Sequence, residues 1–223
     1  MIAGYRHFLR LATRAQWNEA AIDLSADVVA WPSVADERVT ELLAGFCVGE
    51  EGVAEHLGTF FTDDYAKEVF DVQRGDEERH ARFFGRYAKA VGLGDPRAHV
   101  SAEFLDLFER RLPEAAALSG VEAVGVYHMI LEGVVFTAGQ YALLERLDDR
   151  FPGLRRGTEL VLRDERWHVG FGARCLADLE YDEAAILAEG EAAAALWAPE
   201  YAGRVMDGLR SRLRAVRRQA ALL

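Results

Sequence analysis

The sequence predicts an all-α protein: a four-helix bundle with additional helices, formed by a single domain over residues 1–223. Two observations predict this fold. Apolar residues recur at helical spacing through several long segments, which are separated by short breaks rich in Gly, Pro or Asp. Two Glu-x-x-His motifs, Glu77 to His80 and Glu165 to His168, each lie inside such a segment. On an α-helix this spacing places both side chains on one face, close enough to bind one metal ion.

The first 33 residues precede the predicted bundle. Residues 5–15 are expected to form a short helix, followed by an irregular segment from Trp17 to Ser33. Ser33 can cap the next helix, because a serine oxygen at this position accepts a backbone N–H of the first turn.

A long helix is expected over residues 34–61, with one glutamate on its buried face. Its apolar stripe comprises Val39, Leu42, Leu43, Phe46, Val53, Leu57, Phe60 and Phe61. Glu50 falls inside this stripe, whereas Glu51 falls one step off it. A carboxylate on a core stripe is costly unless it is paired or bound to a metal. We therefore predict Glu50, and not Glu51, as a metal ligand.

The first predicted hairpin joins this helix to the one that carries the first Glu-x-x-His motif. A turn at 62–64 leads into a second helix that runs to about Val91, and the break at 92–96 ends the hairpin. Glu50 and Glu77 lie at similar distances from the turn, so antiparallel packing brings them to the same height. Residues 101–112 are expected to form a connecting helix that crosses the bundle.

The second predicted hairpin repeats this arrangement. A third long helix begins near Glu114 or Gly120, runs to about Asp149 and carries Glu132 among apolar residues. After a break at 148–153, the fourth helix carries the second Glu-x-x-His motif. A last helix is expected over 182–219, with an arginine-rich, solvated end.

Two Glu-x-x-His helices plus one inward glutamate from each of two other helices form the ligand set of a carboxylate-bridged two-metal site. Here that set is Glu50, Glu77, His80, Glu132, Glu165 and His168. Carboxylate oxygens with imidazole suit iron or manganese, whereas closed zinc sites favour fewer ligands and cysteine. His56, His99 and His128 lack a partner motif and are not predicted as ligands.

Composition limits the classes of partner. The formal net charge of −11 argues against a nucleic-acid partner. The first 17 residues carry scattered arginines and no continuous apolar run, so neither a signal segment nor a membrane partner is expected. The chain has two cysteines, Cys47 and Cys175, which we expect to be reduced in a cytoplasmic protein.

The chain resembles the small-subunit superfamily of class I ribonucleotide reductases, which has the ferritin-like fold. Trp17 followed by Ile22-Asp23-Leu24-Ser25 is similar to the N-terminal segment of that superfamily, and Arg163-Asp164-Glu165-x-x-His168 is similar to its fourth metal helix. The resemblance implies the same six metal ligands as the spacing does. It also implies that Trp17, Asp164 and His80 form an electron-delivery chain from the surface to the metals, and that the protein is a homodimer.

Within this superfamily the sequence most resembles the ligand-binding oxidases. Two segments carry this resemblance: Gly49-Glu50-Glu51-x-Val53 and Tyr127-x-Met129-Ile130-x-Glu132-Gly133-Val134. It implies an Mn/Fe site, with Fe/Fe as the alternative, that activates O₂ as co-substrate and joins Val53 to Tyr127 by an ether bond. It also implies a long-chain fatty acid or another apolar ligand near the metals, although this chain is shorter than members of that branch.

Three other functions stay open at the level of sequence. One is the radical-generating small subunit of a ribonucleotide reductase, although Phe84 occupies the position of the usual radical-bearing tyrosine. In addition, the chain ends in an arginine-rich helix instead of the tyrosine-containing acidic tail that binds the large subunit. The others are a ferroxidase or iron-storage protein, which would form a many-subunit shell, and a metal-free helical bundle.

Overall fold

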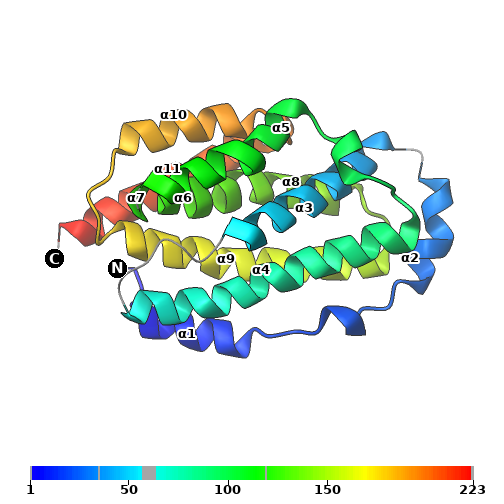
Figure 1. Ribbon diagram of the computed structural model, residues 1–223, viewed down its shortest axis with the longest axis horizontal. Helices are drawn as coiled ribbons and strands as arrows, with labels where there is room; N and C mark the ends of the chain where they lie inside the picture. The colour runs from blue at the N-terminus through cyan, green and yellow to red at the C-terminus, as the bar shows by residue number, and fades with distance from the viewer. Residues whose placement is uncertain (1, 35, 57–63, 119, 222–223) are drawn as a thin grey trace.

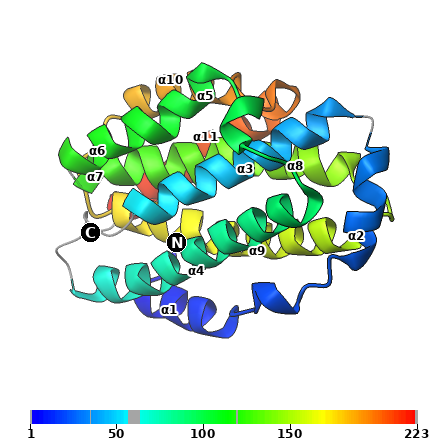
Figure 2. The same cartoon turned by 45° about the vertical axis from the view of Figure 1, so that its right-hand side comes forward.

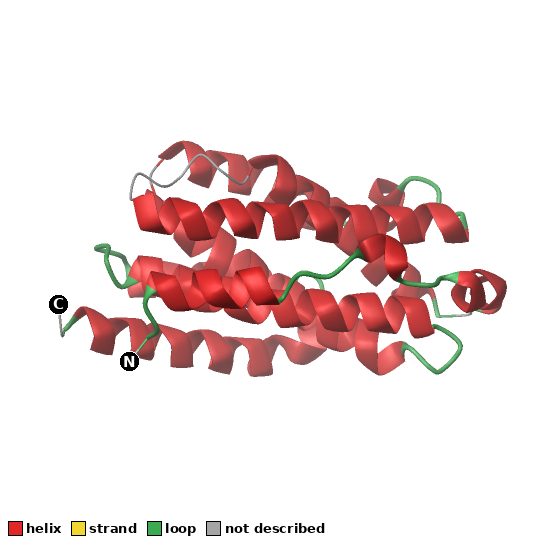
Figure 3. Ribbon diagram, turned by 90° about the horizontal axis from the view of Figure 1, so that it is seen from below, coloured by secondary structure: helices red, strands yellow, loops and turns green. Residues whose placement is uncertain are grey.

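All described secondary structure is helical. The computed structural model describes residues 2–34, 36–56, 64–118 and 120–221, and every element within these ranges is a helix (Figure 3). The all-α prediction is therefore confirmed.

Four long antiparallel stretches form the core bundle (Figure 1). They are α3 (Glu37–His56), α4 (Asp64–Val91), a continuous stretch of three elements, and α9 (Pro152–Leu176). The three elements are α7 (Gly120–Val124), a π-helical segment (Gly125–Phe136) and α8 (Thr137–Arg146). The two predicted hairpins are thus present. The predicted end of the first helix, 57–61, and turn residues 62–63 lie outside the described residues.

The helix that carries Glu132 is not regular, contrary to the sequence prediction. All twelve residues of Gly125–Phe136 are π-helical and buried. In a π-helix the backbone bonds run from i to i+5, so residues five apart share a face. Tyr127 and Glu132 are separated by this interval, and the Thr137 hydroxyl donates to the Glu132 carbonyl oxygen at 2.7 Å. By length and composition 120–146 could cross a membrane, but most of it is buried in the bundle as a core helix.

The predicted last helix, 182–219, is wrong: it is two helices. These are α10 (Glu183–Ala194) and α11 (Ala202–Ala220), with a 3₁₀ turn at Pro199–Tyr201 between them. Pro199 has no backbone N–H to continue the helix, and the chain reverses so that α10 and α11 pack against each other. Both also pack on the π-helical segment Gly125–Phe136.

The N-terminal segment is more ordered than expected. Helix α1 (Tyr5–Arg14) lies along α4 and α9, on the opposite side of the molecule from α10 (Figures 1 and 2). The expected irregular segment contains α2 (Ser25–Ala30), and the Asp36 carboxylate rather than Ser33 accepts the Arg38 N–H at the start of α3.

The remaining elements connect the two hairpins. The predicted crossing helix 101–112 is present and continues to residue 118. It consists of α5 (Ala102–Asp106), a π-helical turn (Leu107–Arg111) and α6 (Leu112–Leu118). Short 3₁₀ turns occur at Glu19–Ala21, Trp31–Ser33 and Pro96–His99.

Candidate metal centre

Each core helix contributes to one buried cluster of carboxylates and imidazoles. Helix α3 supplies Glu50, α4 supplies Glu77 and His80, the π-helical segment supplies Glu132, and α9 supplies the remaining pair. The six side chains are at most 1% exposed. They form two overlapping groups whose ligand atoms lie within 4.8 Å of one another: Glu50, Glu77, His80 and Glu165, and Glu77, Glu132, Glu165 and His168.

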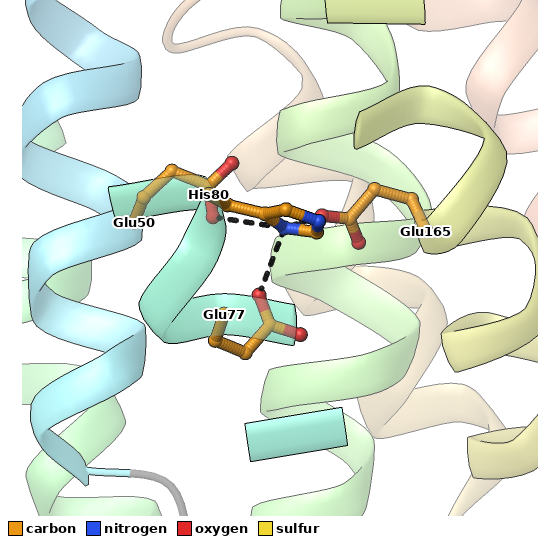
Figure 4. Close-up of side chains that lie close together, drawn as sticks. All are labelled: Glu50, Glu77, His80 and Glu165. Atoms are coloured by element: carbon orange, nitrogen blue, oxygen red, sulfur yellow. Dashed lines mark ion pairs between the residues drawn. The ribbon is translucent and has the colours of Figure 1, made fainter. Parts of the chain in front are cut away.

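We call the first group the His80 position. Figure 4 shows its four side chains converging from three helices. The His80 Nδ1 atom lies 3.6 Å from Glu50 Oε2 and 3.4 Å from Glu77 Oε2. It lies 3.5 Å from Glu165 Oε1. An octahedral ion with bonds of about 2.1 Å separates adjacent ligand atoms by about 3 Å, so this spacing suits a common metal ion.

We call the second group the His168 position. The His168 Nδ1 atom lies 2.8 Å from Glu77 Oε1 and 3.2 Å from Glu132 Oε1. It lies 3.6 Å from Glu165 Oε2. Glu77 and Glu165 therefore present one oxygen to each position, which is the arrangement of carboxylates that bridge two ions.

Most carboxylate oxygens of the cluster lack hydrogen-bond donors. Both oxygens of Glu50 and Glu165, and one oxygen each of Glu77 and Glu132, are buried without a hydrogen bond. Buried carboxylates are strongly unfavourable unless cations compensate them. Two divalent ions would balance the four carboxylate charges, so the residues fit a pair of bound metal ions.

The electrostatics of the metal-free cluster lead to the same conclusion. Burial raises the pKa of Glu50 to about 8, against the opposing effect of His80. Burial and the Glu165 carboxylate raise the pKa of Glu132 well above its usual value. Burial alone would lower the pKa of His80, but Asp164 and the ligand carboxylates around it raise that pKa well above normal. Without metal cations, the shifts of all three pKa values favour the protonated forms.

The outer nitrogen of His80 faces a buried carboxylate that also contacts the N-terminal segment. His80 Nε2 lies 3.3 Å from Asp164 Oδ2, and the indole N–H of Trp17 donates to the same oxygen at 2.6 Å. Burial would raise the pKa of Asp164, but hydrogen bonds from His80 and Trp17 lower it to about 2. The structure thus brings the three residues of the predicted electron-delivery chain together.

Sequence reasoning missed the matching residue on the other histidine. Asp76 is fully buried, and its Oδ2 lies 3.5 Å from His168 Nε2. Asp76 directly precedes Glu77 on α4 but faces His168 on α9. Asp164 directly precedes Glu165 on α9 but faces His80 on α4. The signal was available: both motifs extend to Asp-Glu-x-x-His, at Asp76 and Asp164.

One buried cation joins the two aspartates. The Arg79 guanidinium Nη2 donates to Asp76 Oδ1 at 2.5 Å and to Asp164 Oδ2 at 3.3 Å. Arg79 is 4% exposed and lies over the Trp17 ring, 5.1 Å from its centroid. Gln16 completes this network with hydrogen bonds to Asp76 and from Arg79. The outer side of the centre is therefore ionic.

The other two predicted residues, Tyr127 and Val53, are both buried. The Tyr127 hydroxyl donates to Glu77 Oε1 at 2.8 Å, and the ring is fully buried. Val53 is fully buried on α3, three residues after Glu50.

The structure places Glu51 on the surface, where it pairs with Arg97 at 3.2 Å.

His56, His99 and His128, which were not predicted as ligands, belong to neither ligand group. His56 Nδ1 lies 2.8 Å from the Gly52 carbonyl oxygen, and His99 is exposed. His128 is fully buried, and its Nε2 lies 3.2 Å from Gln73 Oε1.

Comparison with known proteins identifies the fold. No family model and no curated protein matches the chain. Among solved structures, a Tyr-to-Phe mutant of an R2-like ligand-binding oxidase with aerobically reconstituted Mn/Fe cofactor is 22% identical, with a TM-score of 0.75 over 94% of this chain and 92% of that chain. An R2-like ligand-binding oxidase with the same cofactor after a long soak is 26% identical, with a TM-score of 0.68 over 97% of this chain and 79% of that chain.

A Val-to-Ile mutant of an R2-like ligand-binding oxidase gives the same result, at 25% identity and a TM-score of 0.69 over 98% of this chain and 81% of that chain. The chain therefore has the ferritin-like fold of the R2-like ligand-binding oxidases over nearly its whole length. The resemblance expected from the sequence is confirmed at this level.

Proposed function

We propose that this chain is an O₂-activating oxidase whose cofactor is a pair of metal ions, Mn/Fe or Fe/Fe. The observation that carries the proposal is the pair of buried ligand groups that share Glu77 and Glu165. The donor set of carboxylate oxygens and imidazole nitrogens suits iron and manganese. When bound, the two ions supply the redox chemistry with O₂, while the protein supplies ligation, a dry site and access for electrons.

In this proposal the outer aspartates orient the ligand histidines. Asp164 and Asp76 face the Nε2 atoms of His80 and His168, so that each Nδ1 is directed to the metals. Trp17 is half-buried and bonded to Asp164, which makes it the surface end of the proposed electron path.

The proposed internal reaction joins Val53 to Tyr127 through an ether bond. The new carbon–oxygen bond replaces one Val53 C–H and the Tyr127 O–H, and the two protons and two electrons released pass to O₂. Two observations support this proposal: the Tyr127 hydroxyl contacts a ligand carboxylate, and Val53 lies about one turn beyond Glu50 on α3.

The test starts from metal-free protein loaded with Fe(II) and Mn(II) without oxygen and then exposed to O₂. We expect two metal ions per chain, consumption of O₂, and a mass loss of two hydrogens in a joined Val53–Tyr127 peptide. Tyr127→Phe should bind both metals and give no joined peptide. Failure to bind two metals, or to consume O₂ once they are bound, would overturn the proposed oxidase.

Two further readouts separate the alternatives. If O₂ is consumed while Val53 and Tyr127 stay unmodified, the ether-forming part fails and the reaction is on an external substrate. We propose a homodimer, so a solution mass of two chains is expected, whereas a large shell would favour iron storage. Organic extraction of the purified protein tests for the proposed apolar ligand.

A further inference from the structure

Gln73 and His128 belong to neither ligand group, yet both are fully buried against the centre. Gln73 lies on α4, one turn before Glu77, and its Nε2 donates to the Tyr127 hydroxyl at 2.7 Å and to Glu132 Oε1 at 3.0 Å. The same nitrogen lies 3.4 Å from Glu77 Oε1. One carboxamide therefore contacts two carboxylates of the His168 position and the Tyr127 hydroxyl beside them.

His128 determines which way this carboxamide faces. Burial lowers the pKa of His128 to about 3, so its ring is neutral and carries one hydrogen. The partner of His128 Nε2 is Gln73 Oε1, which can only accept, so Nε2 carries the hydrogen. The reversed amide would direct the Gln73 oxygen at Glu77 Oε1, a carboxylate oxygen, and would remove the N–H groups from Glu132 and Tyr127.

His128 is itself fixed by packing. Its ring contacts the Tyr127 ring and the Phe171 ring, with centroids 4.4 Å and 5.6 Å apart. On α9, a Cβ atom at Gly172 would lie 2.2 Å from His128 Cβ, so only glycine leaves room for this arrangement. The His128 ring therefore has a defined place from which to orient Gln73.

We propose that Gln73 and His128 are positioning residues for the His168 position. The His128 N–H holds the Gln73 oxygen, and the Gln73 N–H groups hold Glu132 by one oxygen and Tyr127 by its hydroxyl. The oxygen that Gln73 holds, Glu132 Oε1, is also the one that lies 3.2 Å from His168 Nδ1, so Gln73 fixes an oxygen of the His168 position itself. Among the described residues no hydrogen bond holds either oxygen of Glu50, the corresponding glutamate of the His80 position.

The consequence is that the two metal positions differ in what maintains their ligand geometry. Loss of an outer hydrogen-bond partner typically weakens metal binding by about 10- to 100-fold. Removal of the Gln73 carboxamide should therefore weaken binding at the His168 position and leave the His80 position nearly unchanged. This inference rests on the proposed function only in requiring that the chain binds two ions.

The experiment is a titration of metal-free protein with Mn(II) in the absence of oxygen. Binding is measured by calorimetry and by the EPR signal of free Mn(II). Wild-type protein should bind two ions. Gln73→Leu should weaken one of them by about 10- to 100-fold and the other by less than about twofold. His128→Phe should change the same ion in the same direction. Gln140→Leu is the matched control, because Gln140 is also fully buried but no hydrogen bond links it to the centre.

A double variant assigns the affected position. If Gln73 acts through Glu132, then Gln73→Leu should have no further effect in a Glu132→Gln protein, but should keep its full effect in a Glu50→Gln protein. Wild-type affinities in both Gln73→Leu and His128→Phe, or equal weakening of both ions, would overturn the inference. Failure of wild-type protein to bind two ions would instead overturn the proposed function. Circular dichroism checks folding, and His128→Phe keeps the test valid if Gln73→Leu does not fold.

Discussion

The His80 position and the His168 position carry the same ligand motif and the same kind of outer aspartate, but they differ in the neutral side chains that contact their carboxylates. Around His80 the outer partners are ionic: Asp164, Arg79 and the indole of Trp17 form a continuous network that reaches the half-buried N-terminal segment. Around His168, Asp76 and the same Arg79 provide an equivalent ionic partner, but two neutral side chains, Gln73 and Tyr127, also donate hydrogen bonds to its carboxylates. The sequence motif therefore specifies the centre, and the surroundings make its two halves different.

The helices that carry the two halves differ as well. Glu50 lies on the regular helix α3, whereas Glu132 lies on the π-helical segment Gly125–Phe136. The π-helical repeat turns Tyr127 to the same face as Glu132, so that its hydroxyl reaches the bridging ligand Glu77. The His80 position is thus connected through Asp164 to Trp17 near the surface. The His168 position is connected to Tyr127, a redox-capable side chain in the core.

The largest expected effect comes from a ligand that the two halves share. Glu77→Ala removes an oxygen from both positions, so it should weaken the binding of both ions by more than about 100-fold, since loss of an outer partner alone costs about 10- to 100-fold. His168→Ala should abolish the binding of only one ion. Helical content should stay largely intact in both variants, because apolar packing dominates bundle stability. Metal analysis and circular dichroism measure these outcomes.

The matched comparison uses two adjacent glutamates. Glu50→Gln should remove the ion of the His80 position, because Glu50 belongs to that group only. Glu51→Gln should bind both ions normally, because Glu51 is exposed and pairs with Arg97. Two ions retained in Glu77→Ala, or the reverse ranking of Glu50 and Glu51, would contradict the assignment of the centre.

The bundle, its two hairpins and the placement of the six side chains could be predicted because each depends on local spacing. Apolar periodicity indicates a helix, and three-residue spacing puts Glu77 and His80 on one face. Similar distances from the hairpin turn bring Glu50 to the same height as Glu77. The choice of Glu50 over Glu51 followed from the apolar stripe through Phe46 and Val53.

Other features depend on contacts between segments that are distant in sequence. Gln73 is an ordinary helical residue in sequence, and only its contacts with Tyr127 and Glu132, more than 50 residues away, reveal a role. The π-helical repeat of Gly125–Phe136 has no separate signal in an apolar run. The reversal between α10 and α11 had a signal in Pro199, which outweighs the helical pattern on either side.

The second prediction measures what the ionic side contributes to stability. Arg79→Met should destabilise the metal-free protein by about 3–5 kcal/mol, because Asp76 and Asp164 would stay buried without their shared cation. Gln73→Leu, on the neutral side, should cost about 1–3 kcal/mol from partners left without a hydrogen bond. Urea unfolding followed by circular dichroism gives both values.

Arg82→Met is the control for the arginine variant. Arg82 lies on the same helix, is 55% exposed at its side chain, and forms surface ion pairs with Glu19 and Glu78. Its loss should change stability by no more than about 1 kcal/mol, since exposed pairs contribute little. Equal effects of Arg79→Met and Arg82→Met would show that the outer network is not a stabilising unit.

The smallest predicted effect concerns the packing behind the neutral side. In Gly172→Ala the new methyl group would lie 2.2 Å from His128 Cβ, so helices α9 and 120–146 must separate or His128 must shift. Overpacking of this kind costs about 1–3 kcal/mol. Gly85→Ala on α4, where nothing lies within 4 Å of the added methyl group, should instead stabilise by about 0.5–1 kcal/mol through helix propensity. Because His128 orients Gln73, Gly172→Ala should also weaken the same metal ion as Gln73→Leu, which Gly85→Ala should not do. If Gly172→Ala loses stability but binds both ions normally, His128 contributes to core packing and does not support the ligand geometry of the His168 position.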